Sequence, residues 1–242
     1  GYAPLTDTER LVLGVERYLN SDAFKREFPE TGEDVKVMGV RRGNALSLTL
    51  AVAFVGRHVP DEYHYFRRKE AVREALIEYV TRERGNLEHV DVTLNTLDRP
   101  GLGAGGIYLT VTGTSAESGD DGQVGRGNGI NGLIPMSRPR TTEAPAGKNP
   151  FSHVGKIYTA LAQTTSQQIV EHAPGVREVY VWLVSQIGAP LEEPQAAWAE
   201  VALEPGADEA RTFAAVRDLL DHTLANVETF TQRLAKGELR LY

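Results

Sequence analysis

One strictly alternating segment constrains the fold of this chain more than any other feature. Leucine, valine and phenylalanine occupy every second position from Leu46 to Phe54, with other residues between them. Side chains of a strand point alternately to its two faces, so this pattern predicts a strand that buries one face. The turn sequence Arg42-Gly43-Asn44 and a second strand-like stretch, residues 33–41, precede it, and together they predict a β-hairpin.

Helical signals surround this hairpin. Thr6 and Glu9 have the spacing of a capping box, which predicts a helix that begins there and continues to Asn20. Apolar residues three and four apart predict further helices over residues 21–28, 61–83, 153–172 and 208–236. Alternation predicts further strands over residues 89–95, 107–111, 176–184 and 198–203. Sheets packed against helices, an α+β fold, are the expected outcome.

The periodic pattern stops between Gly113 and Pro150, where glycine, proline, asparagine, serine and threonine are frequent. A loop this long inside a compact domain is usually either functional or disordered. Its mixture of charged and isolated apolar residues favours function. We therefore expect two domains, residues 1–112 and 113–242, of which the second opens with this loop.

The composition excludes several classes of function. A chain without cysteine has no disulfide, thiolate zinc site, iron–sulfur cluster or cysteine nucleophile, and it fits a reducing compartment. The net charge is −7, from 26 basic and 33 acidic residues, so the chain as a whole does not attract nucleic acid. The basic run at residues 67–69 is typical of a solvated helix face. No apolar run approaches the roughly 18 residues of a membrane span, and we expect a cytoplasmic protein that binds neither nucleic acid nor membrane.

Residues 115–132 carry most of the candidate chemistry. Their glycines would let the backbone approach a ligand closely and point amide donors at it. Arg126 offers a fork of donors for phosphate or carboxylate. Asp120 and Asp121 offer acceptors for an amine, for ribose hydroxyls or for Mg²⁺. The sequence Asp-Asp-Gly is also typical of a tight turn, and both interpretations stay open.

Two further groups are candidates for binding an anion. Lys148 lies just before the helix expected from His153, and a helix N-terminus favours anions. The alternative is an ordinary N-cap at Ser152. Asp34 and Lys36 share one face of a predicted strand, for which a solvent-facing strand edge is the simpler interpretation.

Several collinear motifs give the chain a family resemblance. They are Gly32-Glu-Asp-Val-Lys-Val-Met-Gly39, Gly113-Thr-Ser-Ala-Glu117, Ala146-Gly-Lys-Asn-Pro150, His153-Val-Gly-Lys-Ile-Tyr158 and Ser185-Gln-Ile-Gly188. With these motifs in family order along its whole length, the chain resembles the archaeal-type methionine adenosyltransferases, also called S-adenosylmethionine synthetases.

The resemblance implies the synthesis of S-adenosylmethionine from L-methionine and ATP. The methionine sulfur attacks C5′ of ATP, and the triphosphate leaves whole and is then cut to pyrophosphate and phosphate. The implied fold has pseudo-threefold subdomains whose flat sheets pack against those of a second subunit, in a homodimer or a dimer of dimers. Mg²⁺ and K⁺ are the implied cofactors, and the sequence does not identify their ligands.

The resemblance also assigns roles residue by residue. Lys36 would contact the triphosphate, Asp34 would lie near the adenosine, and Asp120 would hold the methionine amino group. Arg126 and Lys148 would grip the triphosphate, and Arg126 would also serve its hydrolysis. The other candidates are a catalytic His153 and the substrate-binding residues Glu117, Asp121, Asn128 and Asn149.

The sequence departs from the family pattern at three places. Family members extend upstream of Gly1 and carry there a Gly-His-Pro-Asp motif with a catalytic histidine and a metal-binding aspartate, so we expect activity to require that N-terminal part. Gly129 stands where the family usually has arginine, and the segment after Ile134 is shifted, so Arg138 or Arg140 would have to compensate. The alternative is a truncated, non-catalytic homologue that binds ATP or S-adenosylmethionine or pairs with a full-length subunit.

Overall fold

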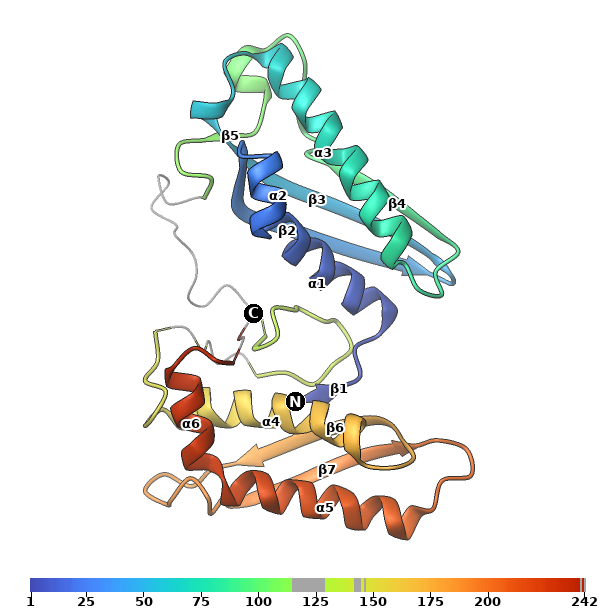
Figure 1. Cartoon of the computed structure of the whole chain (residues 1–242), viewed down its shortest axis with the longest axis vertical. Coiled ribbons are helices and arrows are strands. Elements are labelled where there is room, and N and C mark those ends of the chain that lie inside the picture. The colour runs from blue at the N-terminus through green and yellow to red at the C-terminus, as the bar shows by residue number, and fades with distance from the viewer. Residues whose placement is uncertain (115–128, 142–144, 146, 240, 242) are drawn as a thin grey trace. The chain divides into compact units, whose positions relative to one another are not determined.

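The computed structural model describes residues 1–114, 129–141, 145, 147–239 and 241. The chain forms two compact units (Figure 1), an N-terminal unit of Thr6–Gly122 and a C-terminal unit that joins Gly1–Leu5 to Gln123–Tyr242. The first five residues therefore belong with the second half of the chain. The domain boundary expected near residue 112 stays a prediction, because residues 115–128 lie outside the described part.

The N-terminal unit is a sheet with helices packed on one of its faces (Figure 1). Its elements are α1 (Asp7–Leu19), α2 (Asp22–Glu27), β2 (Thr31–Arg42), β3 (Ala45–Val55), the 3₁₀ turn η1 (Gly56–His58), α3 (Glu62–Glu83), β4 (His89–Leu94), the 3₁₀ turn η2 (Gly103–Gly106) and β5 (Leu109–Thr110). The capping box that predicts the start of α1 is confirmed. Thr6 Oγ1 accepts from Glu9 N at 3.2 Å, and the Glu9 carboxylate accepts from Thr6 N at 2.8 Å.

β3 is the central strand of this sheet. The apolar residues that alternate from Leu46 to Phe54 are all at most 2% exposed, so the predicted burial of one face is confirmed. β2 pairs with one edge of β3 in antiparallel orientation, and β4 and β5 pair in parallel with the two ends of the other edge. The strand expected over residues 107–111 is shorter, because β3 ends at Val55 and offers Val111 no partner.

The C-terminal unit has the strand order β1-β6-β7, with antiparallel pairing throughout. Its elements are β1 (Tyr2–Ala3), α4 (Val154–His172), β6 (Val176–Val184), β7 (Ala196–Leu203), α5 (Glu209–Ala225) and α6 (Val227–Ala235). Val179 and Val181 of β6 are buried against apolar residues of α4 and α5. Both helices therefore cover the same face of the sheet.

The single helix expected over residues 208–236 is wrong, because the chain divides into α5 and α6 at Asn226. The Asn226 side-chain nitrogen donates to the carbonyl of His222 at 2.7 Å. A side chain that binds a carbonyl one turn back competes with the helical ladder. Within α5, Phe213 is 41% exposed, and its neighbour Thr212 is buried with its hydroxyl bound to Pro174 O at 2.7 Å.

Each unit contains an antiparallel hairpin followed by a helix, and the predicted α+β class is confirmed. The sheet face that points away from the helices, called the open face below, carries large apolar side chains in both units. Met38 on β2 is 57% exposed, and Val40 on the same face is also exposed. In the C-terminal unit, Trp198 of β7 stacks on Trp182 of β6 with ring centres 5.5 Å apart.

Candidate active site

Two of the predicted site residues lie together on β2. Lys36 and Asp34 form an ion pair. They alternate with Val35 and Val37, which pack against the core, so the side chains of the ion pair point to the open face. β2 is an edge strand, as the simpler interpretation predicts, but half of the Lys36 side chain remains exposed and accessible to an anion.

A close crossing of two glycine backbones holds the chain just before Asp34. The register between β2 and β3 shifts between Thr31 and Val35, and within this stretch Asp34 N donates to Gly113 O at 3.0 Å. A Cβ atom on Gly32 would lie 2.3 Å from that same oxygen, so only glycine fits there. The crossing therefore places the start of the loop 113–150 next to Asp34.

Lys25 supports this stretch from α2. Its Nζ donates to Thr31 O at 3.1 Å and to Gly32 O at 2.7 Å. Burial lowers the pKa of the Lys25 ammonium to about 8. The sequence pattern does not distinguish Lys25 from a surface lysine, because both of its partners belong to the following strand rather than to its own helix.

A cavity of about 650 Å³ opens beside Lys36. Met38 and Ala51 line it from β2 and β3, and segments 95–98 and 105–108 line it from the side. Small-molecule sites have volumes of roughly 300–1,000 Å³. Among the described residues, the lining carries one cation, Lys36, and one carboxylate, Asp98, which already accepts from Tyr65 and Lys69. The half-exposed Lys36 ammonium beside apolar side chains therefore suits an anionic ligand that also has an apolar or aromatic part.

Asn95 fixes the point where the cavity wall leaves the sheet. It follows β4 with a left-handed φ of 45°. Its side chain accepts from Val52 N at 2.8 Å and donates to Val52 O at 2.9 Å. These bonds satisfy the backbone of β3 in the gap between its pairings with β4 and β5, where buried groups need a partner. The Asn95 amide thus takes the place of a strand residue.

Tyr65 and Lys69 of α3 hold the same wall from behind. The fully buried Tyr65 hydroxyl donates to Asp98 Oδ2 at 2.7 Å and accepts from Asn95 Nδ2 at 3.0 Å. Lys69 Nζ donates to Asp98 Oδ2 at 2.7 Å and to Asn95 O at 2.8 Å. Burial, followed by the hydrogen bond to Asp98, raises the pKa of the Tyr65 phenol, which keeps it a neutral donor.

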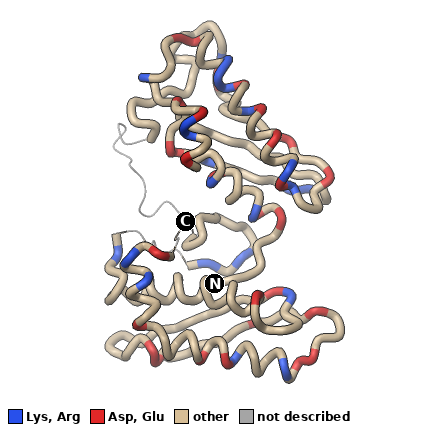
Figure 2. Tube along the Cα trace, in the orientation of Figure 1, with Lys and Arg blue, Asp and Glu red and all other residues tan. Residues whose placement is uncertain are grey.

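The expectation of a solvated basic face at residues 67–69 is therefore wrong for two of its three residues. Lys69 binds Asp98, and Arg68 forms an ion pair with the buried Glu30. Figure 2 shows basic and acidic residues interspersed along α3. Sequence reasoning misses these pairs because the acidic partners lie 38 and 29 residues away from Arg68 and Lys69 along the chain.

The other described candidates form a turn before α4 in the C-terminal unit. Asn149 Oδ1 accepts from the backbone N–H two residues later at 2.8 Å. The N-cap of α4 is His153 rather than Ser152, and its Nδ1 accepts from Lys156 N at 3.4 Å. Lys156 Nζ donates to Lys148 O at 2.9 Å. Lys148, Asn149 and His153 are thus brought together in one turn that the helix start stabilises.

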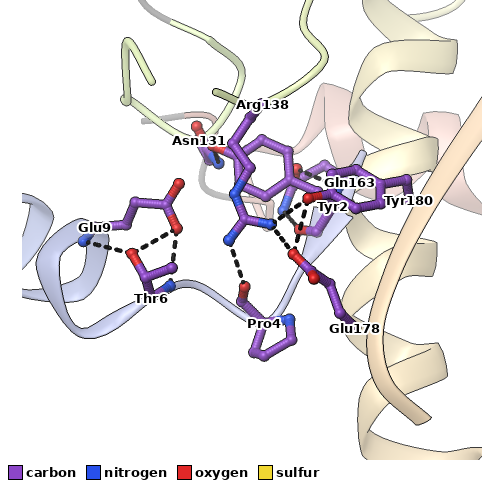
Figure 3. Close-up of polar contacts among 9 residues, drawn as sticks. All are labelled: Tyr2, Pro4, Thr6, Glu9, Asn131, Arg138, Gln163, Glu178 and Tyr180. Atoms are coloured by element: carbon purple, nitrogen blue, oxygen red, sulfur yellow. Dashed lines mark hydrogen bonds and ion pairs between the residues drawn. The ribbon is translucent and has the colours of Figure 1, made fainter. Parts of the chain in front are cut away.

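Arg138 anchors the segment 129–141 on the open face of the C-terminal sheet (Figure 3). Its guanidinium lies 4.7 Å from the centre of the Tyr2 ring. It donates to the Glu178 carboxylate, to Tyr180 Oη at 2.9 Å and to Pro4 O at 3.1 Å. One arginine therefore joins this segment to both β1 and β6.

These contacts bear on the substitution at Gly129. Arg138 is only 5% exposed and its donors are bound within the unit, so it does not fit the compensating role expected for it. The same role for Arg140 stays a prediction. Gly129 N donates to Leu133 O at 2.7 Å, and a Cβ atom at Gly129 would lie 3.1 Å from that oxygen. Gly129 therefore forms a tight turn in which an arginine would require a small shift.

Half of the predicted site lies outside the described residues, namely Glu117, Asp120, Asp121, Arg126 and Asn128. In the part that the structure describes, no group of three histidine, aspartate or glutamate side chains could hold a metal ion. Asp34 is bound to Lys36. One or two carboxylates together with substrate phosphates are enough to hold Mg²⁺, so the ligands of Mg²⁺ and K⁺ stay unassigned.

Comparison with known proteins decides the family. Residues 1–238 match the sequence profile described as S-adenosylmethionine synthetase (AdoMet synthetase). The chain belongs to this family. Its curated relatives include proteins named S-adenosylmethionine synthase from three archaea. The protein of Caldivirga maquilingensis is 47% identical over 99% of this chain and 58% of the relative. The protein of Methanothermobacter thermautotrophicus is 43% identical over 100% of this chain and 60% of the relative. The protein of Archaeoglobus fulgidus is 46% identical over 100% of this chain and 59% of the relative.

Membership in the S-adenosylmethionine synthetase family confirms the archaeal-type resemblance inferred from the motifs. The chain spans about three fifths of the length of the curated relatives it matches. No helix in the described ranges is both long and apolar enough to cross a membrane.

Proposed function

We propose that the protein synthesises S-adenosylmethionine from L-methionine and ATP, with release of pyrophosphate and phosphate. The observation that carries the proposal is the family match over residues 1–238, within which Lys36 lines a cavity of small-molecule size. The proposed activity belongs to the whole protein, and the proposal includes a requirement for an N-terminal part with a catalytic histidine, as the family resemblance implies.

In the proposed reaction the methionine sulfur is the nucleophile, so the protein needs no nucleophilic side chain. It has to hold two substrates in line and stabilise the negative charge of the departing triphosphate. Lys36 would supply positive charge from β2, where its ion pair with Asp34 already orients the ammonium. Arg126 and Lys148 would supply the remaining charge, and Asp120 would hold the methionine amino group.

The turn before α4 contributes the second described group of the proposal. Lys148 would bind phosphate oxygens, and His153 at the N-cap would act beside it in catalysis. Asn149 would bind substrate from the same turn, where its side chain already fixes the backbone. The proposal also assigns substrate binding to Asp34, Glu117, Asp121 and Asn128.

The proposal extends to assembly and cofactors. The exposed apolar side chains on the open faces support a homodimer, or a dimer of dimers, in which these faces of pseudo-threefold subdomains pack together. Mg²⁺ and K⁺ are the proposed ions, and the cytoplasm is the proposed location. Chelation of Mg²⁺ should then abolish product formation.

The test is an assay of the full-length protein with methionine, ATP, Mg²⁺ and K⁺, in which S-adenosylmethionine is quantified by chromatography and the protein by intact mass. Lys36→Met should lower kcat by about 100-fold or more, because a preorganised charge at the leaving group is lost. The control Lys236→Met removes an exposed lysine after α6 and should leave the rate unchanged. A wild-type protein that binds ATP without forming product would instead support the non-catalytic homologue.

A further inference from the structure

The wall of the Lys36 cavity is built from a segment that buries little apolar surface of its own. Leu97, within residues 95–98, is 89% exposed, and Leu102, further along the same loop between β4 and β5, is 60% exposed. Apolar packing therefore does not fix this part of the wall. Its position must come from polar contacts, and these converge on α3.

We propose that Tyr65 and Lys69 are positioning residues for this cavity, which set its wall at residues 95–98 from behind and never touch the ligand. Asn95 and Asp98 line the cavity, whereas Tyr65 and Lys69 do not. The inference rests on the proposed function only for the identity of the ligand.

The hydrogen bonds show how two side chains can control both parts of the wall. The Asp98 carboxylate receives the Tyr65 hydroxyl and the Lys69 ammonium on the same oxygen, each at 2.7 Å. The Tyr65 hydroxyl oxygen also accepts from Asn95 Nδ2 at 3.0 Å and from Tyr108 N at 3.4 Å. Tyr65 thus connects segment 95–98 to segment 105–108, at the other end of the loop between β4 and β5.

The loop between these segments has a further attachment to α3. Gly101 N donates to the carboxylate of Glu62 at 2.8 Å, and Arg99 N donates to Gly106 O at 2.7 Å. The loop between β4 and β5 is therefore attached to α3 at several points. α3 itself packs into the core through Val72, Leu76 and Val80. A rigid helix behind a polar wall is the arrangement that keeps a binding site in one geometry.

Loss of this support should appear in substrate binding. Tyr65→Phe keeps the buried ring but removes one donor to Asp98 and the common acceptor of Asn95 and Tyr108. A displaced wall loses contacts with the bound substrate, so the substrate binds more weakly. A wall that contacts substrate equally in the ground state and the transition state changes KM and leaves kcat as it was.

The experiment compares kcat and KM for ATP and for methionine in the full-length protein and its variants Tyr65→Phe and Lys69→Met. Both variants should raise KM for at least one substrate by about tenfold, with kcat per folded enzyme unchanged. The control is Glu70→Gln, which breaks the exposed ion pair with Arg73 on the same helix and should leave both constants unchanged. Thermal unfolding measured on each variant gives the folded fraction.

A purely structural role would lower Vmax and the unfolding temperature with KM unchanged, and that result in both variants would overturn the proposal. Calorimetric titration with ATP tests the positioning role independently of the proposed function. If the wild-type protein forms no S-adenosylmethionine, the proposed function fails, and a Kd for ATP about tenfold weaker in both variants still supports the positioning role. In that inactive protein, equal Kd values for ATP, or no ATP binding by the wild-type protein, would overturn it.

Discussion

At the scale of the single residue, Asn95 shows how one side chain can replace a piece of strand. Its amide makes the two bonds to Val52 that a backbone would otherwise make, and its left-handed φ turns the chain out of the sheet. Asparagine tolerates this conformation better than most residues. Both properties are required together, since the side chain reaches Val52 only because the backbone has already turned.

We predict that Asn95→Gly lowers the free energy of unfolding by about 3 kcal/mol, because two buried backbone groups of Val52 lose their partners. Glycine adopts the left-handed φ freely, so this variant isolates the hydrogen bonds from the backbone effect. Asn95→Ala should cost about 1 kcal/mol more. Urea denaturation measures the unfolding free energy of both variants. The control is Asn44→Gly, because the Asn44 side chain donates to the exposed Glu88 rather than to a buried backbone group. An Asn95→Gly protein as stable as the wild type would show that water replaces the amide.

The same residue marks a limit of what the sequence can predict. The shared face of Asp34 and Lys36 follows from the two-residue period of a strand, and the structure confirms it. The partners of Asn95, Lys69 and Arg68 lie 26 to 43 residues away along the chain. No local pattern encodes such pairings, because they depend on how α3 and β4 meet β3.

At the scale of the element, periodicity and capping predict most helices and strands correctly. α1 begins at its capping box, β3 contains the whole alternating segment 46–54, and β6 matches its expected range, since each strand buries one regular face. The failures have local causes. β5 is short because its partner strand ends, and the last helix divides because the Asn226 side chain competes for a carbonyl. The spacing of apolar residues along the sequence does not reveal either cause.

The contact between β2 and the loop start gives a prediction at this scale. Gly32→Ala would place a Cβ atom 2.3 Å from Gly113 O and 2.7 Å from Ala53 O, so the two backbones must separate. We expect a loss of about 2 kcal/mol in unfolding free energy, as for other overpacked sites. Gly56→Ala, whose added Cβ atom would lie 3.5 Å from Thr110 O, is the matched control. Denaturant unfolding measures the free energy of unfolding of both variants. A Gly32→Ala protein as stable as the Gly56→Ala protein would contradict a tight contact between the Gly32 and Gly113 backbones.

At the scale of the whole molecule, each unit covers one sheet face with helices and leaves apolar side chains on the other. Isolated exposed apolar residues are ordinary on protein surfaces. Here they recur on equivalent faces of two units, with Val40 on β2 and the stacked Trp182 and Trp198 on the other sheet. This recurrence supports a protein whose open faces are covered by a second copy of itself.

We therefore predict that Val40→Glu weakens self-association by at least about tenfold, because it would bury an unpaired carboxylate in the interface. Val40 lies on the open face but does not line the Lys36 cavity, so the change leaves the proposed site in place. Tyr63→Glu, on α3 with 78% of its side chain exposed, introduces the same charge on the helical side and should leave the assembly unchanged. Sedimentation velocity of the full-length protein at micromolar concentration measures both. A wild-type monomer, or a Val40→Glu dimer as stable as the wild type, would show that a second copy does not cover this open face.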